Sequence, residues 1–324
     1  MKRLVFILLL VTVLSFSNLV VYTYDSMVSG LAKDIAPIFE SFYGEKVSFV
    51  SFGDAGKALS RLIIEGEKTK ADIILGLDQN LLLKAEKYGI LMKYKPVNYT
   101  KIKEALRPKE YLATPFDYGS IAIVYNTKTV KNPPKSFKDL LDPRFRRKIV
   151  VEDPRTSSTG LSFLLWTVAV YGEKFTDYWK KLKENLLTIT SGWDEAFEML
   201  ERGEADIMVS YLTDGAYSYY YYKSTKFLPT VMKEGMFVQI EYVGIVKYTK
   251  KLELAKRFIE LMLSDYVQEK IPLRQWMFPV TDVKLPEVFQ KYVPKVEKIL
   301  ELDPKEISKN LNKWISEWEE ALGM

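Results

Sequence analysis

The sequence predicts an α/β protein in which mixed sheets flanked by helices form two lobes with a ligand cleft between them. Apolar strand-like stretches alternate with stretches of helical spacing in the first ninety or so residues. A second set of such elements begins near residue 120. Two long extended stretches, 113–125 and 237–246, stand between the sets and predict a paired crossing between lobes. Open α/β sheets bind ligands in such clefts, beside the carboxyl ends of strands.

The first set alternates strand and helix regularly. Its strands are apolar, and its helices carry apolar residues three and four positions apart, as Leu59, Leu62 and Ile63 do. The order β-α-β-α-β-α is typical of a largely parallel sheet. We expect strands over 19–22, 47–52 and 72–77 and helices over 29–43, 56–65 and 79–88.

The second set and the tail complete the chain. We expect strands over 121–125, 148–151, 187–189, 206–210 and 237–246. Helical spacing occurs over 161–170, 174–186, 194–202, 252–263, 285–293 and 304–322. Residues 18–115 are therefore assigned to a first lobe, 116–239 to a second, and 240–324 to the first lobe again.

Residues 1–17 have the pattern of a secretory signal peptide. Lys2 and Arg3 precede an apolar run, 4–14, that is too short to span a bilayer, and small residues follow it. We expect cleavage near Ser17 and export to the periplasm; a retained membrane anchor is the alternative. Cleavage lowers the net charge from +5 to +3, and mixed charges without a long basic run do not indicate nucleic-acid binding.

The composition argues against an enzyme. The chain has no histidine and no cysteine, which excludes disulfides, zinc–thiolate sites, thiol catalysis and the usual general base. The patterns GxSxG and SxxK do not occur in the sequence. Glu152 and Asp153 are neighbours in a predicted strand and point to opposite faces, so we do not expect them to act together.

Polar and aromatic residues gather where predicted strands end. Ser157 and Ser158 precede an apolar helix, where they suit either an N-cap or a site for phosphate or another anion. Asp54 suits either a cap or a binding role. Trp193 starts a helix among small polar residues, whereas Trp166 is assigned to the core. The stretches are YTYDS (22–26), FGDAG (52–56), TPFDYGS (114–120), DPRTSSTG (153–160), SGWDEA (191–196), SYLTDGAY (210–217) and RQWMFPV (274–280).

Six tyrosines lie within the stretch SYLTDGAYSYYYYK. Aromatic faces together with a carboxylate suit a positively charged, partly aromatic ligand. In a helix, Tyr217 and Tyr221 share a face, whereas Tyr219 and Tyr220 turn away from it. The consecutive rings therefore cannot all line one site, and Tyr211 and Tyr217 are the candidates for ligand contact.

These stretches together resemble the thiamine-binding periplasmic proteins of bacterial thiamine ABC importers, which are two-lobed extracellular solute-binding proteins. The resemblance implies the type II periplasmic-binding-protein fold and a monomer that binds thiamine or its phosphate esters as a transported ligand, not as a cofactor. It implies a membrane permease with its ATPase as partners. The matching text runs in order from Val21 to Trp318: VYTYDS, KADIILGLDQNLL, PFDYG, NPPKSFKDLL, DPRTSSTGLSFLLW, VYG, SGWDEA, SYLTDGAY, QWMFPV, LP and WISEW.

The resemblance also implies which residues bind the ligand. Rings among them would stack on the thiazolium and aminopyrimidine of thiamine, and a desolvated cation over such a ring gains up to ~2 kcal/mol. The family commonly has proline where Thr159 stands, a hydroxyl where Asp214 stands and a tryptophan near Leu31. The charge of Asp214 favours the thiazolium and disfavours a nearby phosphate. The implied residues are Tyr24, Asp54, Ala55, Ser157, Ser158, Trp193, Tyr211, Leu212, Thr213, Asp214, Tyr217 and Trp276.

A receptor of the same fold for ferric ion, or for another metal or anion, is the alternative. Adjacent tyrosines ligate iron in that group of receptors, and Tyr220 with Tyr221 resembles such a pair. The histidine that usually supports such a site does not occur in this chain.

Overall fold

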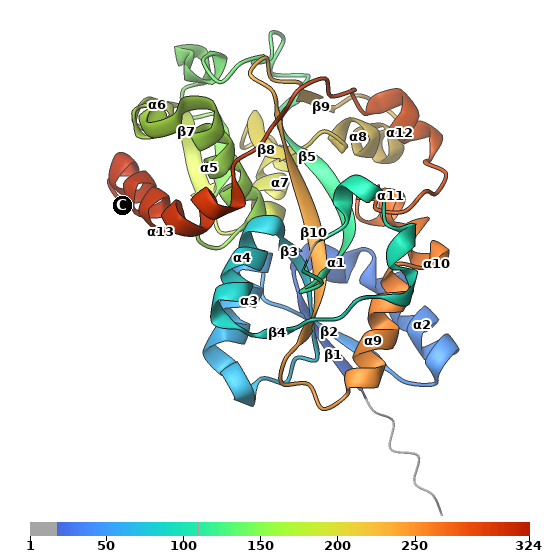
Figure 1. Ribbon diagram of the computed structural model, residues 1–324. Helices are drawn as coiled ribbons and strands as arrows, with labels where there is room; N and C mark the ends of the chain where they lie inside the picture. The colour runs from blue at the N-terminus through green and yellow to red at the C-terminus, as the bar shows by residue number, and fades with distance from the viewer. Residues whose placement is uncertain (1–17, 109) are drawn as a thin grey trace, which may run out of the picture.

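The computed structural model describes residues 18–108 and 110–324, which form two lobes joined by a pair of long strands (Figure 1). The predicted signal peptide lies outside the described residues. The strands are β1 (Leu19–Thr23), β2 (Val47–Ser51), β3 (Ile73–Asp78), β4 (Leu91–Met92), β5 (Thr114–Asn126), β6 (Ile149–Glu152), β7 (Leu186–Thr190), β8 (Ile207–Tyr211), β9 (Phe227–Thr230), β10 (Met236–Val246), β11 (Phe278–Pro279) and β12 (Ile299–Leu300).

The helices cover both faces of the strands (Figure 1). They are α1 (Asp25–Ser29), α2 (Ala32–Tyr43), α3 (Ala55–Glu65), α4 (Gln79–Tyr88), α5 (Ser158–Tyr171), α6 (Phe175–Leu182), α7 (Trp193–Arg202), α8 (Asp214–Tyr222), α9 (Leu252–Met262), α10 (Asp265–Gln268), α11 (Ile271–Arg274), α12 (Glu287–Tyr292) and α13 (Pro304–Leu322).

The strands form a mixed sheet in the order β2-β1-β3-β10-β5-β8-β6-β7. β1 pairs in parallel with β2 and β3, and β6 pairs in parallel with β7 and β8. Between these two parallel groups, β10 and β5 pair antiparallel from Phe237 opposite Ile121 to Val243 opposite Thr114. The predicted fold class, including the paired crossing, is confirmed.

Several elements differ from the prediction. The expected helix 29–43 is interrupted after Ser29, because Gly30 leaves the helical conformation where its backbone approaches the Arg274 carbonyl. A Cβ on Gly30 would lie 2.7 Å from that oxygen. The edge strand β9 was not predicted, and Pro229 within it weakens the strand signal. The short elements β11, α10 and α11 are too brief for periodicity to indicate.

Large aromatic side chains fill the core around α5, α6 and α13. Trp166 is fully buried, and its Nε1 donates a hydrogen bond to the Gly235 carbonyl at 3.0 Å, which confirms its assignment to the core. Trp318 of α13 is also fully buried and packs edge-on against Trp179 of α6, with ring centroids 5.8 Å apart. This ring pair fixes the C-terminal helix to the rest of the protein.

The predicted lobe boundaries, after residues 115 and 239, stay a prediction. β5 and β10 run through these positions without interruption. Near the C-terminus, α12 packs against α8, and α13 contacts both α6 and α4 (Figure 1). The end of the segment 240–324 therefore reaches helices of both lobes.

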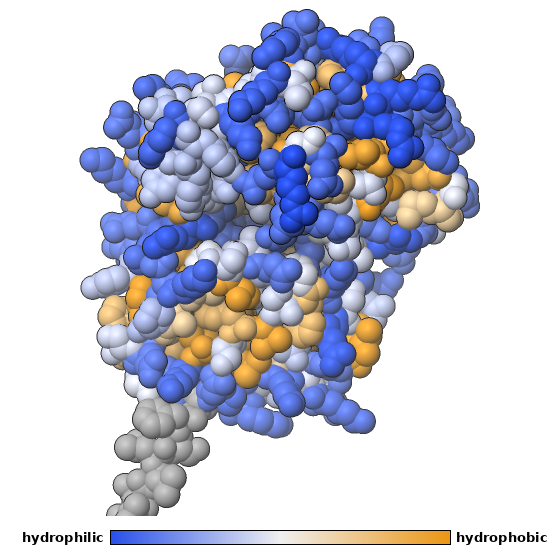
Figure 2. Space-filling view, turned by 180° about the vertical axis from the view of Figure 1, so that it is seen from behind, coloured by the Kyte–Doolittle hydropathy of each residue, from blue (hydrophilic) through white to orange (hydrophobic). Residues whose placement is uncertain are grey.

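A cavity of about 500 Å³ lies between α4, β10 and the segment 299–307. Apolar residues form most of its wall, and Lys103 and Glu301 are the charged residues in it. The face seen in Figure 2 is largely polar and carries separate apolar patches. No helix in the described part of the chain combines the length and apolar character needed to cross a membrane.

We predict that Trp318→Ala lowers the free energy of unfolding by about 3–5 kcal/mol, because it removes a fully buried indole and leaves a cavity beside Trp179. Urea denaturation followed by circular dichroism measures the change. Lys313→Ala, at an exposed position of the same helix, is the control and should change stability by less than about 0.5 kcal/mol. Equal losses in both variants would contradict the proposed anchoring.

Candidate functional site

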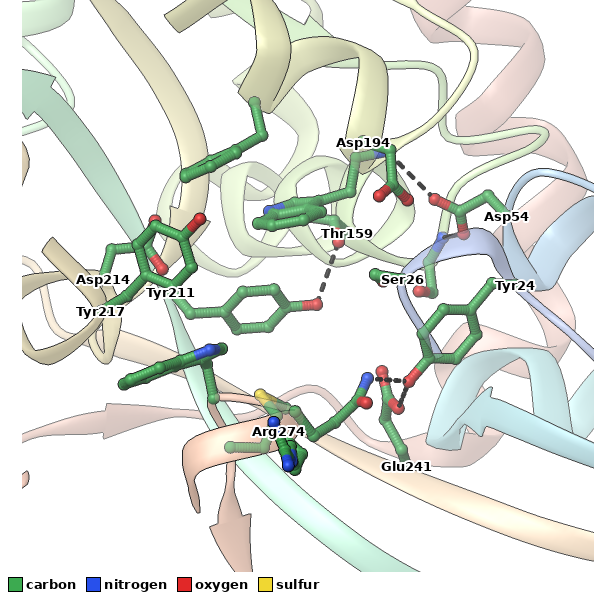
Figure 3. Close-up of a pocket in the computed structure, with 16 residues that line it drawn as sticks. Tyr24, Ser26, Asp54, Thr159, Asp194, Tyr211, Asp214, Tyr217, Glu241 and Arg274 are labelled. Carbon is green, nitrogen blue, oxygen red and sulfur yellow. Dashed lines mark hydrogen bonds between the residues drawn. The ribbon is translucent and has the colours of Figure 1, made fainter. Parts of the chain in front are cut away.

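A pocket of about 90 Å³ lies where the two lobes meet the crossing strands (Figure 3). Helix starts contribute most of one wall, and the ends of β1 and β8, the middle of β10 and the turn after α11 contribute the rest. The lining residues are Tyr24, Ser26, Asp54, Ser158, Thr159, Trp193, Asp194, Phe197, Tyr211, Asp214, Tyr217, Glu241, Arg274, Gln275, Trp276 and Met277.

The structure brings together most of the residues expected from the sequence. Four of them do not line the pocket but lie directly beside residues that do. Ser157 caps α5, its Oγ accepting a hydrogen bond from Gly160 N, and Leu212 and Thr213 are buried under the start of α8. Ala55 is buried at the start of α3. A ligand-binding role for each residue stays a prediction. Those in the lining are Tyr24, Asp54, Ser158, Trp193, Tyr211, Asp214, Tyr217 and Trp276.

Asp54 joins three helix N-termini at one corner of the pocket. Its carboxylate caps α3 by accepting Ala55 N at 2.6 Å. It also accepts Ser158 N at the start of α5 and Trp193 N at the start of α7, each at 3.2 Å. The cap interpretation of Asp54 is confirmed, whereas its binding role stays a prediction, although the carboxylate also lines the pocket. Converging N–H groups and helix dipoles favour a negative charge here, although burial raises the pKa of Asp54.

Tyr24 and Glu241 form a second corner of the pocket. The Tyr24 hydroxyl donates to Glu241 Oε2 at 2.6 Å and accepts from Gln275 Nε2 at 2.6 Å. Gly76 of β3 makes room for this ring: it has φ +100°, and a Cβ there would lie 2.0 Å from the tyrosine ring. Tyr24 can occupy this position only because residue 76 has no side chain.

A chain of hydrogen bonds crosses the floor of the pocket from β10 to α5. Gln239 Nε2 donates to Glu241 Oε1 and to the Tyr211 hydroxyl, both at 3.0 Å. The Tyr211 hydroxyl also lies 3.0 Å from Thr159 Oγ1, toward which it points (Figure 3). The central strand and the second lobe are thus held in one network.

Aromatic rings surround the opposite end of the pocket, where Asp214 lies (Figure 3). Trp193 stacks on Phe197 with centroids 4.8 Å apart, and Tyr217 meets Phe197 and Trp276 edge-on at 5.2 Å. Asp214 is buried beside them, and burial raises its pKa to about 7. Such rings offer faces to a flat or cationic group.

The tyrosine run divides as its helical spacing predicts for Tyr219, but not for Tyr220, which packs on Trp276 as Tyr217 and Tyr221 do. Tyr217 and Tyr221 share a face, with ring centroids 4.7 Å apart. Tyr219 instead stacks on Tyr292 at 4.2 Å, and Tyr222 donates to Glu201. Tyr220 and Tyr221 are partly exposed and pack around Trp276, outside the pocket lining.

The lining contains more acidic than basic groups. Four carboxyl groups face it, and burial raises the pKa of Asp194 to about 6 and that of Glu241 to about 8. Arg274 is the one basic residue among the described lining residues, and its Nε pairs with Asp34 at 2.7 Å. The part of the chain that the structure describes contains no group of three or more His, Cys, Asp or Glu residues able to hold a metal ion. The arrangement suits an aromatic cation.

The sequence did not single out eight of the lining residues. Six of them lie within stretches already noted, so the sequence indicated the correct part of the chain but not these residues as ligand contacts. They are Ser26, Thr159, Asp194, Arg274, Gln275 and Met277. Glu241 is the one charged residue in the extended run FVQIEYVGIV, a signal that was available. Phe197, one turn after Trp193, carries no signal that separates it from a core residue.

Comparison with known proteins gives consistent matches along the chain. Residues 68–310 match the family described as bacterial extracellular solute-binding protein. A thiamine-binding periplasmic protein of Brucella melitensis is 39% identical over 93% of this chain and 91% of its own. One from Escherichia coli is 36% identical over 99% of both chains. The solved structure of a periplasmic thiamin binding protein superposes with a TM-score of 0.90 at 36% identity, covering 94% of this chain and 96% of that one.

We predict that Asp54→Ala lowers the free energy of unfolding by about 2 kcal/mol, because it leaves the amides at three helix starts without their common acceptor. Asp303→Ala, which removes an exposed cap from α13, is the control and should cost only about 1 kcal/mol. Thermal unfolding of both variants measures the difference. A smaller loss for Asp54→Ala than for Asp303→Ala would contradict the role of Asp54 as a common acceptor.

Proposed function

The chain belongs to the thiamine-binding periplasmic proteins within the bacterial extracellular solute-binding protein family, and from that we propose that it binds thiamine in the periplasm for an ABC importer. Proteins of this family bind and release a ligand without chemical change, so the chain is a binding protein and not an enzyme. In this proposal, the molecule that the importer transports is the one that binds in the pocket described above.

The observation that carries the proposal is an aromatic pocket with an excess of buried carboxyl groups. Thiamine combines a permanent thiazolium cation with a flat aminopyrimidine ring. The rings of Trp193, Tyr217 and Trp276 suit both parts, and Asp214 among them suits the cation. A neutral or anionic ligand would leave these carboxyl groups without a counter-charge.

We extend the proposal to the phosphate esters of thiamine. The starts of α3, α5 and α7 meet at Asp54, and Ser158 lines the pocket at the same corner. Helix N-termini favour anions. Because the Asp54 carboxylate already accepts these amides, a phosphate has to displace it, which makes the esters weaker competitors than their charge alone suggests.

The partners follow from the proposed role. A periplasmic receptor delivers its ligand to a membrane permease driven by an ATPase, and we propose that this chain does so as a monomer. Two lobes joined by β5 and β10 suit closure around a ligand, since a pair of crossing strands absorbs a hinge motion in a few residues.

For the alternative of a ferric-ion receptor, Tyr220 and Tyr221 offer no support, because they pack around Trp276 and not into the pocket.

Calorimetric titration of the mature protein with thiamine tests the proposal. We expect saturable binding at one site per chain and a change in tryptophan fluorescence, since Trp193 and Trp276 line the pocket. Absence of saturable binding at millimolar thiamine would overturn the proposal.

We predict that Asp214→Ser weakens the binding of unphosphorylated thiamine by roughly fivefold, or ~1 kcal/mol, since it removes a buried negative charge from the aromatic end of the pocket. Glu198→Ser, an exposed carboxylate on α7, is the control and should leave the affinity unchanged. If Asp214→Ser leaves thiamine binding unchanged but tightens thiamine diphosphate, Asp214 lies at the phosphate end instead.

We predict in addition that Ser158→Ala weakens the phosphate esters selectively, because it removes a hydroxyl at the corner where three helix starts converge. Titration of one variant with thiamine and with thiamine monophosphate gives the ratio of affinities. An equal loss for both ligands would argue that Ser158 acts on the pocket as a whole.

A further inference from the structure

Two buried carboxyl groups face each other across the central strand pair. Glu241 of β10 is directly opposite Asp117 of β5 in the antiparallel register. Side chains at opposite positions have Cβ atoms roughly 5 Å apart, and like charges placed there repel each other. Asp117 is fully buried, and Glu241 is only 5% exposed and lines the pocket.

The hydrogen bonds to this pair supply no positive charge. Glu241 accepts from the Tyr24 hydroxyl at 2.6 Å and from Gln239 Nε2 at 3.0 Å, both neutral donors. Neither oxygen of Asp117 has a hydrogen-bond partner among the described residues. Two carboxyl groups held this close in a buried site cannot both ionise without a large cost, so such a pair retains a proton.

The surrounding elements add to the negative charge. Among the described residues that line the pocket beside Glu241, Arg274 is the only basic one, and its guanidinium is paired with Asp34. Burial raises the pKa of Asp117 and also that of Glu241, the latter to about 8. The titratable and charged groups facing Glu241 are Asp117 from β5, Tyr24 before α1, Tyr211 from β8, Asp54 before α3, Asp78 from β3 and Arg274 from α11.

We propose that the Asp117–Glu241 pair is a specificity element of the pocket: Asp117 keeps its proton throughout, and Glu241 is protonated in the free protein and loses its proton to water when a cationic ligand fills the pocket that it lines. The inference rests on the proposed function. The O–H bond of the carboxyl group breaks, the proton leaves to solvent, and the carboxylate takes the ligand cation as its counter-charge. A neutral ligand of the same shape provides no such replacement.

Proton release on binding determines the direction in which the affinity for thiamine changes with pH. A bound cation lowers the pKa of the pair, so binding releases a proton wherever the pH lies between the lowered pKa and the free value, which is about 8 for Glu241. Over that range thiamine binds more tightly as the pH rises, by up to tenfold per pH unit. The dependence ends above the free pKa, where the proton has already left.

Calorimetry of thiamine binding tests the proposal directly. Titrations at pH 7 in two buffers of different ionisation enthalpy, HEPES and Tris, give the number of protons released. We expect a value approaching one proton per thiamine at pH 7 and a smaller value at pH 8.5. An uncharged analogue, with a thiophene in place of the thiazolium, is the matched ligand control and should release no proton.

Two variants assign the proton to the pair. Glu241→Gln removes the titrating group from the pocket and should reduce proton release at pH 7 to less than about 0.3 per thiamine. Asp117→Asn is the matched control, because it keeps a neutral group of the same shape opposite Glu241, so the proton release should persist with little change. Asp214→Asn tests another buried carboxyl group in the lining and should leave most of the release in place.

The outcomes separate the inference from the proposed function. Thiamine binding without proton release in the wild type would overturn the inference and leave the proposed function intact. Release that persists in Glu241→Gln but disappears in Asp214→Asn would also overturn it, because the proton then belongs to the aromatic end of the pocket. Absence of any thiamine binding would overturn the proposed function and the inference with it.

Discussion

The antiparallel pairing of β5 with β10 is the interaction on which the other features depend. It joins two groups of parallel strands into one sheet, and all the helix starts that reach the pocket are attached to strands on one side of it or the other. Because successive residues of a strand point to opposite faces, Gln239 and Glu241 share one face of β10, where Glu241 lines the pocket and Gln239 donates a hydrogen bond to it. The strands that join the two lobes therefore also form the floor of the pocket.

Electrostatics then determines what the pocket can hold. Desolvation of a carboxyl group without a counter-charge is costly, and proteins normally relieve it by pairing or protonation. Here the acidic groups are buried among aromatic rings, and Arg274 is engaged elsewhere. Protonation of these groups relieves that cost in the free protein, as their raised pKa values indicate, and a cationic ligand of the kind proposed above would replace the protons.

The sequence predicted the architecture well because its apolar residues recur clearly with the spacing of a strand in some stretches and with the spacing of a helix in others. The apolar strands of the first lobe and the long extended run over β10 are recognisable without tertiary information. Short stretches at strand ends indicated where the pocket would lie, which is why Trp193, Tyr211 and Trp276, all in its lining, were among the expected residues. Asp117 and Phe197 were missed for different reasons. Asp117 could not be recognised because its partner Glu241 lies more than a hundred residues away in the sequence. Phe197 could not be recognised because its stack on Trp193 forms only in the folded protein.

The position of α13 has a mechanical consequence. The helix contacts α4 in one lobe and α6 in the other, so any movement that separates these two helices must break one of the two contacts. Its indole anchor lies on the α6 side, whereas the chain leading into it borders the large cavity against α4. Interiors resist shear where they are densely packed and yield where they are not. If the two lobes move apart, the contact of α13 with α4 is the one expected to break first, because the buried Trp179–Trp318 pair holds α13 to α6.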